Sequence, residues 1–245
     1  MNKKFTIGVT AALGAVGLLA YYLRFRPWQR RWGATDEELQ RTHPGDELFP
    51  EADQMLMRVV TVKATPTMIW PWLVQIGQGK AGFYSFDWLE NLAGLKMKNA
   101  RGINADWQHL QIGDIIPVEP EGRGFKVYLL EPERALVFGG RKGEAGVFEV
   151  CTRRAPAFSW AFILVPLDSE RTRLISRWRN LSQTSPWNTL TDIFVVPLDF
   201  LMTRRMLQGI KQRAEKTGEL AEKPEEAEKK PGSNGAVTST TAMQL

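Results

Sequence analysis

Few side chains in this sequence could do acid–base chemistry, and they are mainly carboxylates and one tyrosine. Asp87 and Glu90 are three residues apart in a segment with helical spacing, so they would share one face of a helix. Such a pair can work as acid and base only when burial separates the two pKa values, and a solvated helix face is the simpler expectation. Asp199 interrupts an apolar stripe; an outward position is expected, and an inward one would let it orient a polar ligand group.

Histidine, cysteine and metal chemistry have little support. The only histidines, His43 and His109, lie in polar, loop-like stretches, and Cys151 is the single cysteine. These residues cannot build a typical structural zinc site, and one cysteine cannot form an intrachain disulfide. The nucleophile elbow, the Walker loop and the His-Glu-x-x-His motif do not occur. We therefore assign no catalytic residue, no metal and no cofactor.

The segment 77–82 (GQGKAG) matches the glycine pattern of dinucleotide-binding loops. That function needs a strand before the loop and a helix after it, with the helix N-terminus facing the pyrophosphate. Here the preceding residues have helical spacing and include Pro71. The pattern is therefore interpreted as a flexible glycine turn between two helices.

Residues 5–23 form an apolar run of 19 residues without a charge. At about 1.5 Å per residue this run spans roughly 28 Å, close to the thickness of a bilayer core. We predict a single membrane-spanning anchor over residues 1–31, including its basic flanks. A signal peptide cut after Ala20 is the alternative, but Leu18 is bulky for the position it would occupy. Two lysines precede the run and four arginines follow it, which favours a cytoplasmic C-terminal domain.

The net charge of +5 does not indicate a nucleic-acid-binding protein. Residues 1–31 hold six basic residues and no acid, whereas residues 215–245 hold four lysines and six glutamates. The remainder of the chain is close to neutral, so the basic excess belongs to the flanks of the apolar run. No nucleic-acid partner is predicted, and the sequence does not assign an oligomeric state.

The elements that must position any site begin after a mixed stretch. Residues 32–54 are predicted to be a juxtamembrane linker with one short helix near 36–41, and the folded domain is predicted over 55–216. A strand at 56–63, a helix starting at Thr65-Pro66 and a second helix at 85–95 come first. Further strands are predicted at 112–118, 125–130, 135–138, 147–151, 158–165 and 173–180.

The last two strands have the clearest pattern. Bulky apolar residues alternate with smaller ones along 158–164, and arginines alternate with apolar residues along 172–178. This pattern predicts an antiparallel sheet with one covered face and one face whose arginines reach water. A helix over about 190–216 would cover the apolar face, with a kink or interruption at Pro197. Residues 217–245 are predicted to be a disordered charged tail.

The order of elements, and several segments, resemble a known superfamily. Residues 70–92 (WPWLVQIGQGKAGFYSFDWLENL), 110–117 (LQIGDIIP), 174–178 (LISRW) and 204–215 (RRMLQGIKQRAE) resemble a membrane-anchored bacterial branch of the SRPBCC superfamily, which includes START, polyketide cyclase and birch-pollen-allergen-like domains. The resemblance covers roughly 55–216. It implies an α+β helix-grip fold, in which a curved antiparallel sheet wraps around a long C-terminal helix and encloses a hydrophobic cavity.

That cavity would be the functional site, and the 77–82 loop would border its mouth, so Phe83 and Tyr84 could gate entry. The candidate lining residues are Trp70, Phe83, Tyr84, Phe86, Trp88, Trp160, Phe162, Trp178, Asp199 and Met202. For any single aromatic residue, filling the core is the simpler role. The expected function is membrane-anchored binding of a lipid- or polyketide-like apolar molecule.

Two other functions remain open at this point. A cyclase- or aromatase-like enzyme could act by positioning a reactive chain with few polar groups, and it would use Tyr84, Asp87 and Asp199. Alternatively, the chain could be a membrane partner module whose cavity is filled by its own aromatic side chains. The volume between the final helix and the sheet separates binding from this last function.

Overall fold

The computed structural model describes residues 13, 14, 16, 17, 19–148, 152, 155–181 and 186–228, with the side chains of 193–218 in the last range. Its centre is one six-stranded antiparallel sheet with the strand order β1-β6-β5-β4-β3-β2. The strands are β1 (Gln54–Val62), β2 (Ile115–Pro117), β3 (Gly124–Glu131), β4 (Ala135–Arg141), β5 (Ala157–Pro166) and β6 (Thr172–Asn180). The first strand therefore lies beside the last one, at one edge of the sheet.

The pairing of β5 with β6 follows the predicted alternation. Trp160 lies opposite Trp178, and Leu164 lies opposite Leu174. Because side chains alternate between the faces of a strand, these residues share one face of the sheet with Phe158 and Phe162. The expected strand at 147–151 is not among the strands: Val147 forms an isolated bridge with Gly124, and residues 149–151 lie outside the described residues.

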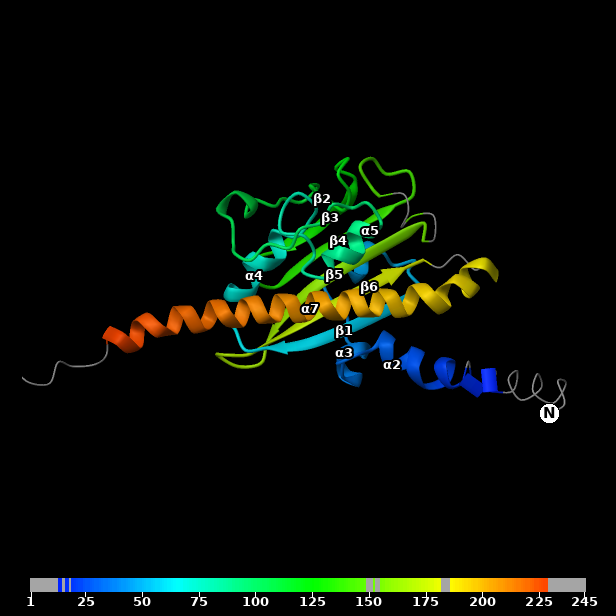
Figure 1. Cartoon of the computed structure of the whole chain (residues 1–245), viewed down its shortest axis with the longest axis horizontal. Coiled ribbons are helices and arrows are strands. Elements are labelled where there is room, and N and C mark those ends of the chain that lie inside the picture. Colours follow the sequence, from blue (N-terminus) through cyan, green and yellow to red (C-terminus); the bar gives the residue numbers. More distant parts are fainter. Residues whose placement is uncertain are drawn as a thin grey trace, which may run out of the picture.

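A long helix, α7 (Pro186–Glu228), crosses the inner face of the sheet (Figure 1). Its core contacts come from Met206, Leu207, Ile210 and Ala214, all fully buried. The helix runs without interruption through Pro197, where the sequence predicted a kink or break. It also continues past Lys216, the predicted end, as far as Glu228; residues 229–245 lie outside the described residues. This arrangement of sheet and C-terminal helix is the predicted helix-grip arrangement.

Two shorter helices, α4 (Pro66–Val74) and α5 (Asp87–Leu92), complete the inner layer. Thr65 precedes α4 as predicted, although its side chain makes no capping hydrogen bond. Helix α4 packs against α7. Between α5 and β2 the chain makes one short helical turn, η3 (Ala105–Trp107).

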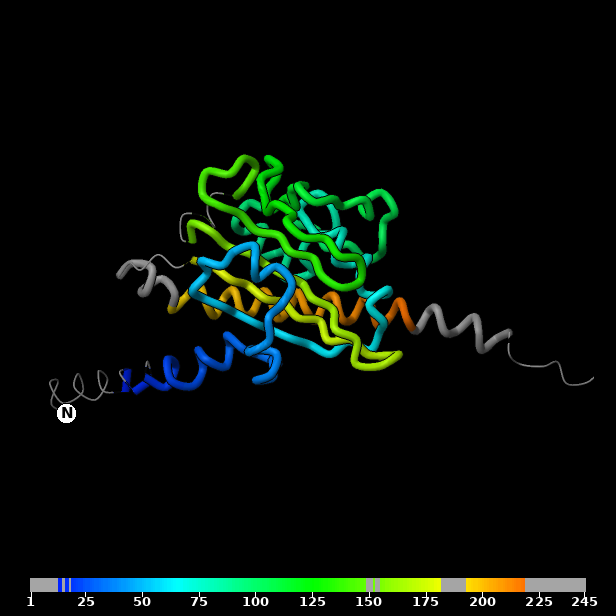
Figure 2. Tube along the Cα trace, turned by 180° about the vertical axis from the view of Figure 1, so that it is seen from behind, coloured from blue at the N-terminus to red at the C-terminus, as the bar shows by residue number. Residues whose placement is uncertain are grey.

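The outer face of the sheet is also covered, by residues 33–50 (Figure 2). This segment contains α3 (Asp36–Gln40) and the turn η2 (Asp46–Leu48). A second apolar cluster lies beneath it and joins the segment to the sheet; it contains Ala34, Leu39, Leu48, Met57, Val59, Val137, Ala161, Ile163 and Ile175. Residues 32–54, expected to be a linker, thus pack onto the folded domain.

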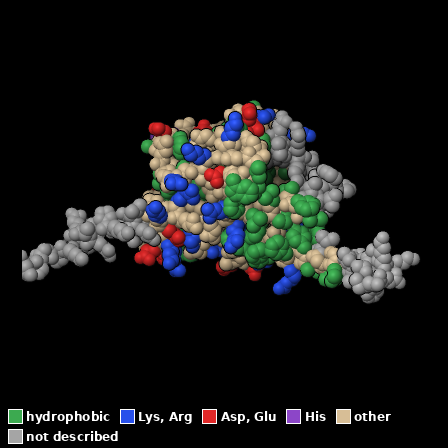
Figure 3. Space-filling view, viewed as in Figure 1, with side chains coloured by type: hydrophobic (Ala, Val, Ile, Leu, Met, Phe, Trp, Pro, Cys, Tyr) green, Lys and Arg blue, Asp and Glu red, His purple; other side chains and the backbone are tan. Residues whose placement is uncertain are grey.

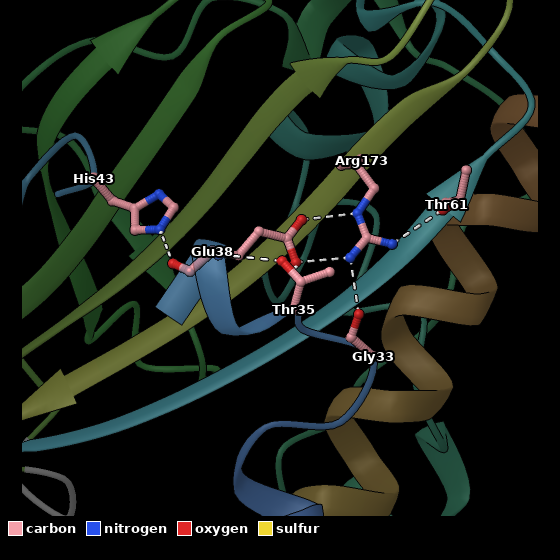
Figure 4. A network of polar contacts seen from close by, with 6 residues as sticks. All are labelled: Gly33, Thr35, Glu38, His43, Thr61 and Arg173. Carbon is pink, nitrogen blue, oxygen red and sulfur yellow. Dashed lines mark hydrogen bonds and ion pairs between the residues drawn. The ribbon is translucent and has the colours of Figure 1, made fainter. Parts of the chain in front are cut away.

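The arginines of β6 point to this covered outer face, not to open water as the sequence predicted. Arg173 donates two hydrogen bonds of 2.8 Å to the carboxylate of Glu38 in α3 (Figure 4). Arg177 is buried and forms an ion pair with Asp46, which also pairs with Arg179 at 3.3 Å. The alternation in the sequence assigned these arginines to the correct face, but it could not show that acids from residues 33–50 would meet them there.

The N-terminal part of the described chain consists of a π-helical turn, η1 (Tyr21–Phe25), and α2 (Arg26–Arg30), and α2 packs against β1 and α7. Among the described residues, no helix has the length and apolar character needed to cross a membrane. Residues 5–12, 15 and 18 of the predicted anchor lie outside the described residues. The anchor and its orientation therefore stay predictions.

Candidate functional site

A cluster of aromatic side chains lines the inner face of the sheet, and we call it the aromatic wall: Phe83, Phe125, Phe158, Trp160 and Trp178. Phe158 stacks on Trp178 at 4.7 Å between ring centroids, and Trp160 stacks on Phe83 at 6.2 Å. The indole of Trp160 donates a 2.8 Å hydrogen bond to the Ser176 hydroxyl, so its polar edge is satisfied inside the sheet. Both tryptophans are only partly buried, because they lie where the cover of α7 becomes incomplete.

Helix α7 covers the two ends of the inner face differently. Residues 203–214 contribute the buried side chains that pack against the sheet and α4. In the preceding turns, Phe194, Val195, Leu198 and Leu201 are exposed, although they are large and apolar. We call residues 193–202 the first half of α7. A helix on a protein surface usually buries its apolar stripe, whereas this part of α7 exposes large apolar side chains to solvent.

A cleft of about 40 Å³ separates the first half of α7 from the aromatic wall. It is lined by Leu56, Arg58, Trp160, Ser176, Trp178, Asp199 and Thr203. Pockets for drug-sized ligands measure roughly 300–1,000 Å³, whereas a single water needs about 10–15 Å³. The cleft thus has room for only a few waters. The space that the described residues enclose between this part of α7 and the aromatic wall is therefore smaller than the ligand-sized cavity expected here.

The polar end of the cleft is an ion pair between β1 and α7. The guanidinium of Arg58 lies 2.7 Å from the carboxylate of Asp199, and the Arg58 side chain is only 3% exposed. Arg58 also donates to the backbone carbonyl of Gln29 at 3.2 Å and lies over the ring of Phe200. Because an unpaired buried charge is costly, Asp199 neutralises Arg58. Asp199 therefore points into the cleft, where the sequence made an outward position the simpler expectation.

The other predicted lining residues lie around this cleft, not in it. Phe162 is fully buried among Phe138 and Trp160, as a core residue. Trp70 is half-buried against the main core, and Met202 is half-buried on α7.

On α5 the two predicted aromatics are Phe86 and Trp88. Phe86 is partly buried and precedes the helix, whereas Trp88 is 61% exposed to solvent. Their rings contact each other at 6.4 Å. Neither side chain lines the cleft.

Sequence reasoning missed four cleft residues: Leu56, Arg58, Ser176 and Thr203. Arg58 carried a usable signal, since it is a charged residue in an apolar strand and shares a face with buried Val60 and Val62. Ser176 alternates in register with Trp178 and could have been found in the same way.

Tyr84 is a structural residue of the core. Its hydroxyl donates to the Trp72 carbonyl at 2.9 Å and accepts from the Gln75 side chain at 2.9 Å. Burial raises the pKa of Tyr84 above its usual value, against the smaller opposing effects of Gln75 and Arg213. Both functions of the hydroxyl are thus used within the protein, so Tyr84 is not placed as a gate or as a proton donor to the cleft.

The glycine loop is a closed turn. Gly77 and Gly82 form an isolated antiparallel β-bridge. The Gly77 amide donates to the Gly82 carbonyl at 3.1 Å, and the Gly82 amide donates to the Gly77 carbonyl at 2.9 Å. The amides of Gln78, Lys80 and Ala81 also donate to backbone carbonyls. Amides that are engaged in this way cannot cradle a phosphate, which agrees with the interpretation as a turn between two helices.

Asp87 and Glu90 do not form a solvated pair. Glu90 is buried and accepts a hydrogen bond from the Ser85 hydroxyl, whereas Asp87 is partly exposed. Burial raises the pKa of Glu90, and Asp87 adds to this effect. Among the described residues, no group of three or more His, Cys, Asp and Glu side chains is placed to hold a metal ion.

A broader and more polar groove of about 640 Å³ lies near the C-terminal part of α7. It is lined by Lys63, Ala64, Thr65, Met68, Ser169, Glu170, Arg171, Lys211, Glu215 and Gly218. Its central charges are paired internally, since Glu215 accepts the Lys63 amide at 2.8 Å and lies 3.5 Å from the Lys211 ammonium. Most of its lining residues are polar or charged, so this groove is less suited to the apolar ligand that the sequence predicts.

Comparison with known proteins gives distant structural likenesses. No protein-family model and no curated protein matches the chain. Among solved structures, norcoclaurine synthase from Thalictrum flavum is 16% identical, with a TM-score of 0.36, over 70% of this chain and 92% of that one. Protein MLL2253 from Mesorhizobium loti is 14% identical, with a TM-score of 0.35, over 67% and 98%. The Aha1 dimer from Colwellia psychrerythraea is 16% identical, with a TM-score of 0.32, over 61% and 96%. These likenesses are too weak to assign a family, a ligand or an activity to the chain.

Proposed function

We propose that the chain binds an apolar small molecule between the aromatic wall and the first half of α7, while residues 5–23 hold it at a membrane. The observation that carries this proposal is the incomplete cover of the wall. Trp160 and Trp178 stay partly exposed at the point where α7 turns four large apolar side chains outward. An apolar guest in the cleft would remove the exposed parts of the two tryptophan side chains from water, at about 25 cal/mol per Å² of apolar area.

Binding requires the first half of α7 to move away from the sheet, because the cleft of about 40 Å³ is too small for such a guest. The packing supports this division of the helix. Residues 203–214 hold α7 to the sheet, whereas the first half contacts it mainly through Phe200 and the Asp199–Arg58 pair. A ligand would therefore open the cleft from its less densely packed end.

Extraction of bound molecules tests the proposal. The full chain is purified, extracted with organic solvent and analysed by mass spectrometry for apolar molecules present in molar proportion. The variant Thr203→Leu fills the cleft from α7 with a good helix former and should lose most of the bound molecule. Thr217→Leu is the matched control, since Thr217 is a half-buried α7 threonine that does not line the cleft. An empty wild-type protein, or equal retention by both variants, would contradict the proposal.

The second candidate function is a membrane module without a ligand, and the small cleft volume favours it. In that case the aromatic wall is core packing, and the exposed apolar side chains serve contacts with other molecules. The same extraction separates the two functions, because this candidate requires that nothing co-purifies. The cyclase-like enzyme has less support, since the Tyr84 hydroxyl and the Asp199 carboxylate are both engaged within the fold.

A further inference from the structure

The first half of α7 presents a row of exposed apolar side chains. Phe194 is 75% exposed, and Leu198 and Leu201 follow it at helical spacing on the same side. Val195 flanks this row and is also exposed. Large apolar side chains at single positions are ordinary on a protein surface, but a contiguous group marks a contact surface.

Helix α5 extends this surface. Trp88 and Leu92, both well exposed, lie on this six-residue helix. The guanidinium of Arg205 lies 5.8 Å from the Phe86 ring and thereby ties the start of α5 to α7. We call Phe194, Val195, Leu198, Leu201, Trp88 and Leu92 the apolar patch; Figure 3 shows the hydrophobic side chains gathered over this end of the molecule.

The N-terminal helix reaches the same end of the molecule. Trp28 of α2 contacts Phe200 of α7, with ring centroids 5.1 Å apart, and Phe25 contacts Trp28 at 5.4 Å. Phe25 and Trp28 are partly exposed and continue the apolar surface towards residue 21. The described end of the apolar run, at residues 21–23, thus leads into α2, which contacts α7 (Figure 1).

Basic residues predominate around the patch. Arg204 and Arg205 are exposed on α7, three and four residues after Leu201, and Arg24 is exposed beside the N-terminal run. Two acids also lie here: Asp87 of α5 is partly exposed, and Asp199 is paired with Arg58. An apolar surface edged by arginines is complementary to a bilayer that contains anionic lipids.

We propose that the apolar patch is a membrane-docking surface, so that the folded domain lies on the bilayer with the first half of α7 and α5 in the interface. A second copy of the chain fits the patch less well, because a two-fold contact would bring like-charged arginine edges together. The proposal rests on the membrane attachment of the proposed function, but not on a ligand. It places the partly covered aromatic wall next to the lipid.

Depth-dependent quenching on the full chain tests the docking surface. In a Cys151→Ser background, Leu198→Cys carries a fluorophore in the patch, and Leu167→Cys carries it on the turn between β5 and β6. Leu198 and Leu167 are matched, at 45% and 50% exposed. The labelled chains are bound to phosphatidylcholine vesicles that contain phosphatidylglycerol and lipids with a nitroxide in the acyl region. Quenching about twofold or more stronger at position 198 than at position 167 is expected for a side chain inserted at the acyl boundary.

A charge-insertion variant completes the test. Phe194→Glu with Leu201→Glu should leave flotation with the vesicles intact but abolish the extra quenching at position 198, whereas Leu167→Glu should leave it unchanged. Equal quenching at both positions in the wild-type background overturns the docking surface while the membrane attachment stands. Disulfide formation between two chains carrying Leu198→Cys on lipid-diluted vesicles also overturns it, in favour of a second copy. A full chain that does not float with vesicles overturns both the docking surface and the attachment.

Discussion

Glu38 should be a strong determinant of stability, although the sequence predicts that residues 32–54, to which it belongs, form a linker. Its carboxylate accepts two 2.8 Å hydrogen bonds from Arg173 and a third of 2.8 Å from the Thr35 amide (Figure 4). Arg173 in turn donates to the Gly33 carbonyl at 2.8 Å and to the Thr61 hydroxyl at 3.1 Å. Replacement of Glu38 by alanine removes one of the two acids that join residues 33–50 to β6, and Asp46 is the other.

The expected cost follows from these contacts. Hydrogen bonds that involve a charged group contribute about 1.5–3 kcal/mol each, and a lost helix N-cap interaction costs about 1 kcal/mol. The contributions do not add fully, and the Glu38 and Arg173 side chains are each 17% exposed, so water compensates part of the loss. We expect Glu38→Ala to lower the free energy of unfolding by about 2–4 kcal/mol, which corresponds to roughly 5–12 °C in Tm.

Urea unfolding followed by tryptophan fluorescence measures this loss, and hydrogen exchange of residues 33–50 locates it. Glu37→Ala is the matched control, because Glu37 is an exposed acid at the next position of the same helix. Its effect should stay within about 0.5 kcal/mol. A loss for Glu38→Ala no larger than that of Glu37→Ala would refute the reasoning, as would unchanged hydrogen exchange in residues 33–50.

The stabilisation that Glu38 provides should also depend on pH, in a direction that follows from its pKa. Although burial raises the pKa of Glu38, the hydrogen bonds from Arg173 and Thr35 outweigh it and hold the pKa below its usual value. A carboxylate with a lowered folded-state pKa stabilises the protein above its unfolded pKa, about 4.3, and loses this contribution as the pH falls through the folded value. The difference in the free energy of unfolding between wild type and Glu38→Ala should therefore have its full size at pH 7 and should decrease below about pH 4.

Two further predictions concern the inner layer. A Cβ atom at Gly209 would lie 2.4 Å from the Tyr84 carbonyl oxygen, so Gly209→Ala should cost about 1–3 kcal/mol in urea unfolding. Gly218→Ala is the control in the same helix, where the nearest atom is the Met68 thioether at 3.3 Å; it should be neutral or stabilising by up to about 1 kcal/mol. Equal effects of the two substitutions would contradict the close approach of α7 to Tyr84. Because burial raises the pKa of Glu90, its stabilising contribution is present below the unfolded pKa and is lost as the pH rises through the folded value. The Glu90→Gln variant can still accept the hydrogen bond from Ser85. It should therefore gain stability relative to wild type between pH 4 and pH 7. If the difference in stability between the two proteins did not change with pH, the raised pKa of Glu90 would be contradicted.

Local sequence patterns predicted most of the elements. The alternation in β5 and β6 assigned Trp160, Trp178 and Arg173 to their correct faces, because the side-chain period of a strand is two residues. The C-terminal helix followed from its apolar stripe, whereas the wrapping of the sheet around it followed from a resemblance that also implied a cavity. The cavity was the weaker inference, since the same aromatic side chains can line a space or fill it.

What covers each face of the sheet was decided only by the tertiary structure. The acids Glu38 and Asp46 lie more than one hundred residues before the arginines that they pair with, and no local period connects them. Asp199 likewise turns inward because Arg58 of β1 lies beneath it, although its position on an apolar helix stripe suggested solvent. Periodicity in a sequence specifies the direction of a side chain relative to its own strand or helix, whereas the atoms that it meets depend on long-range packing.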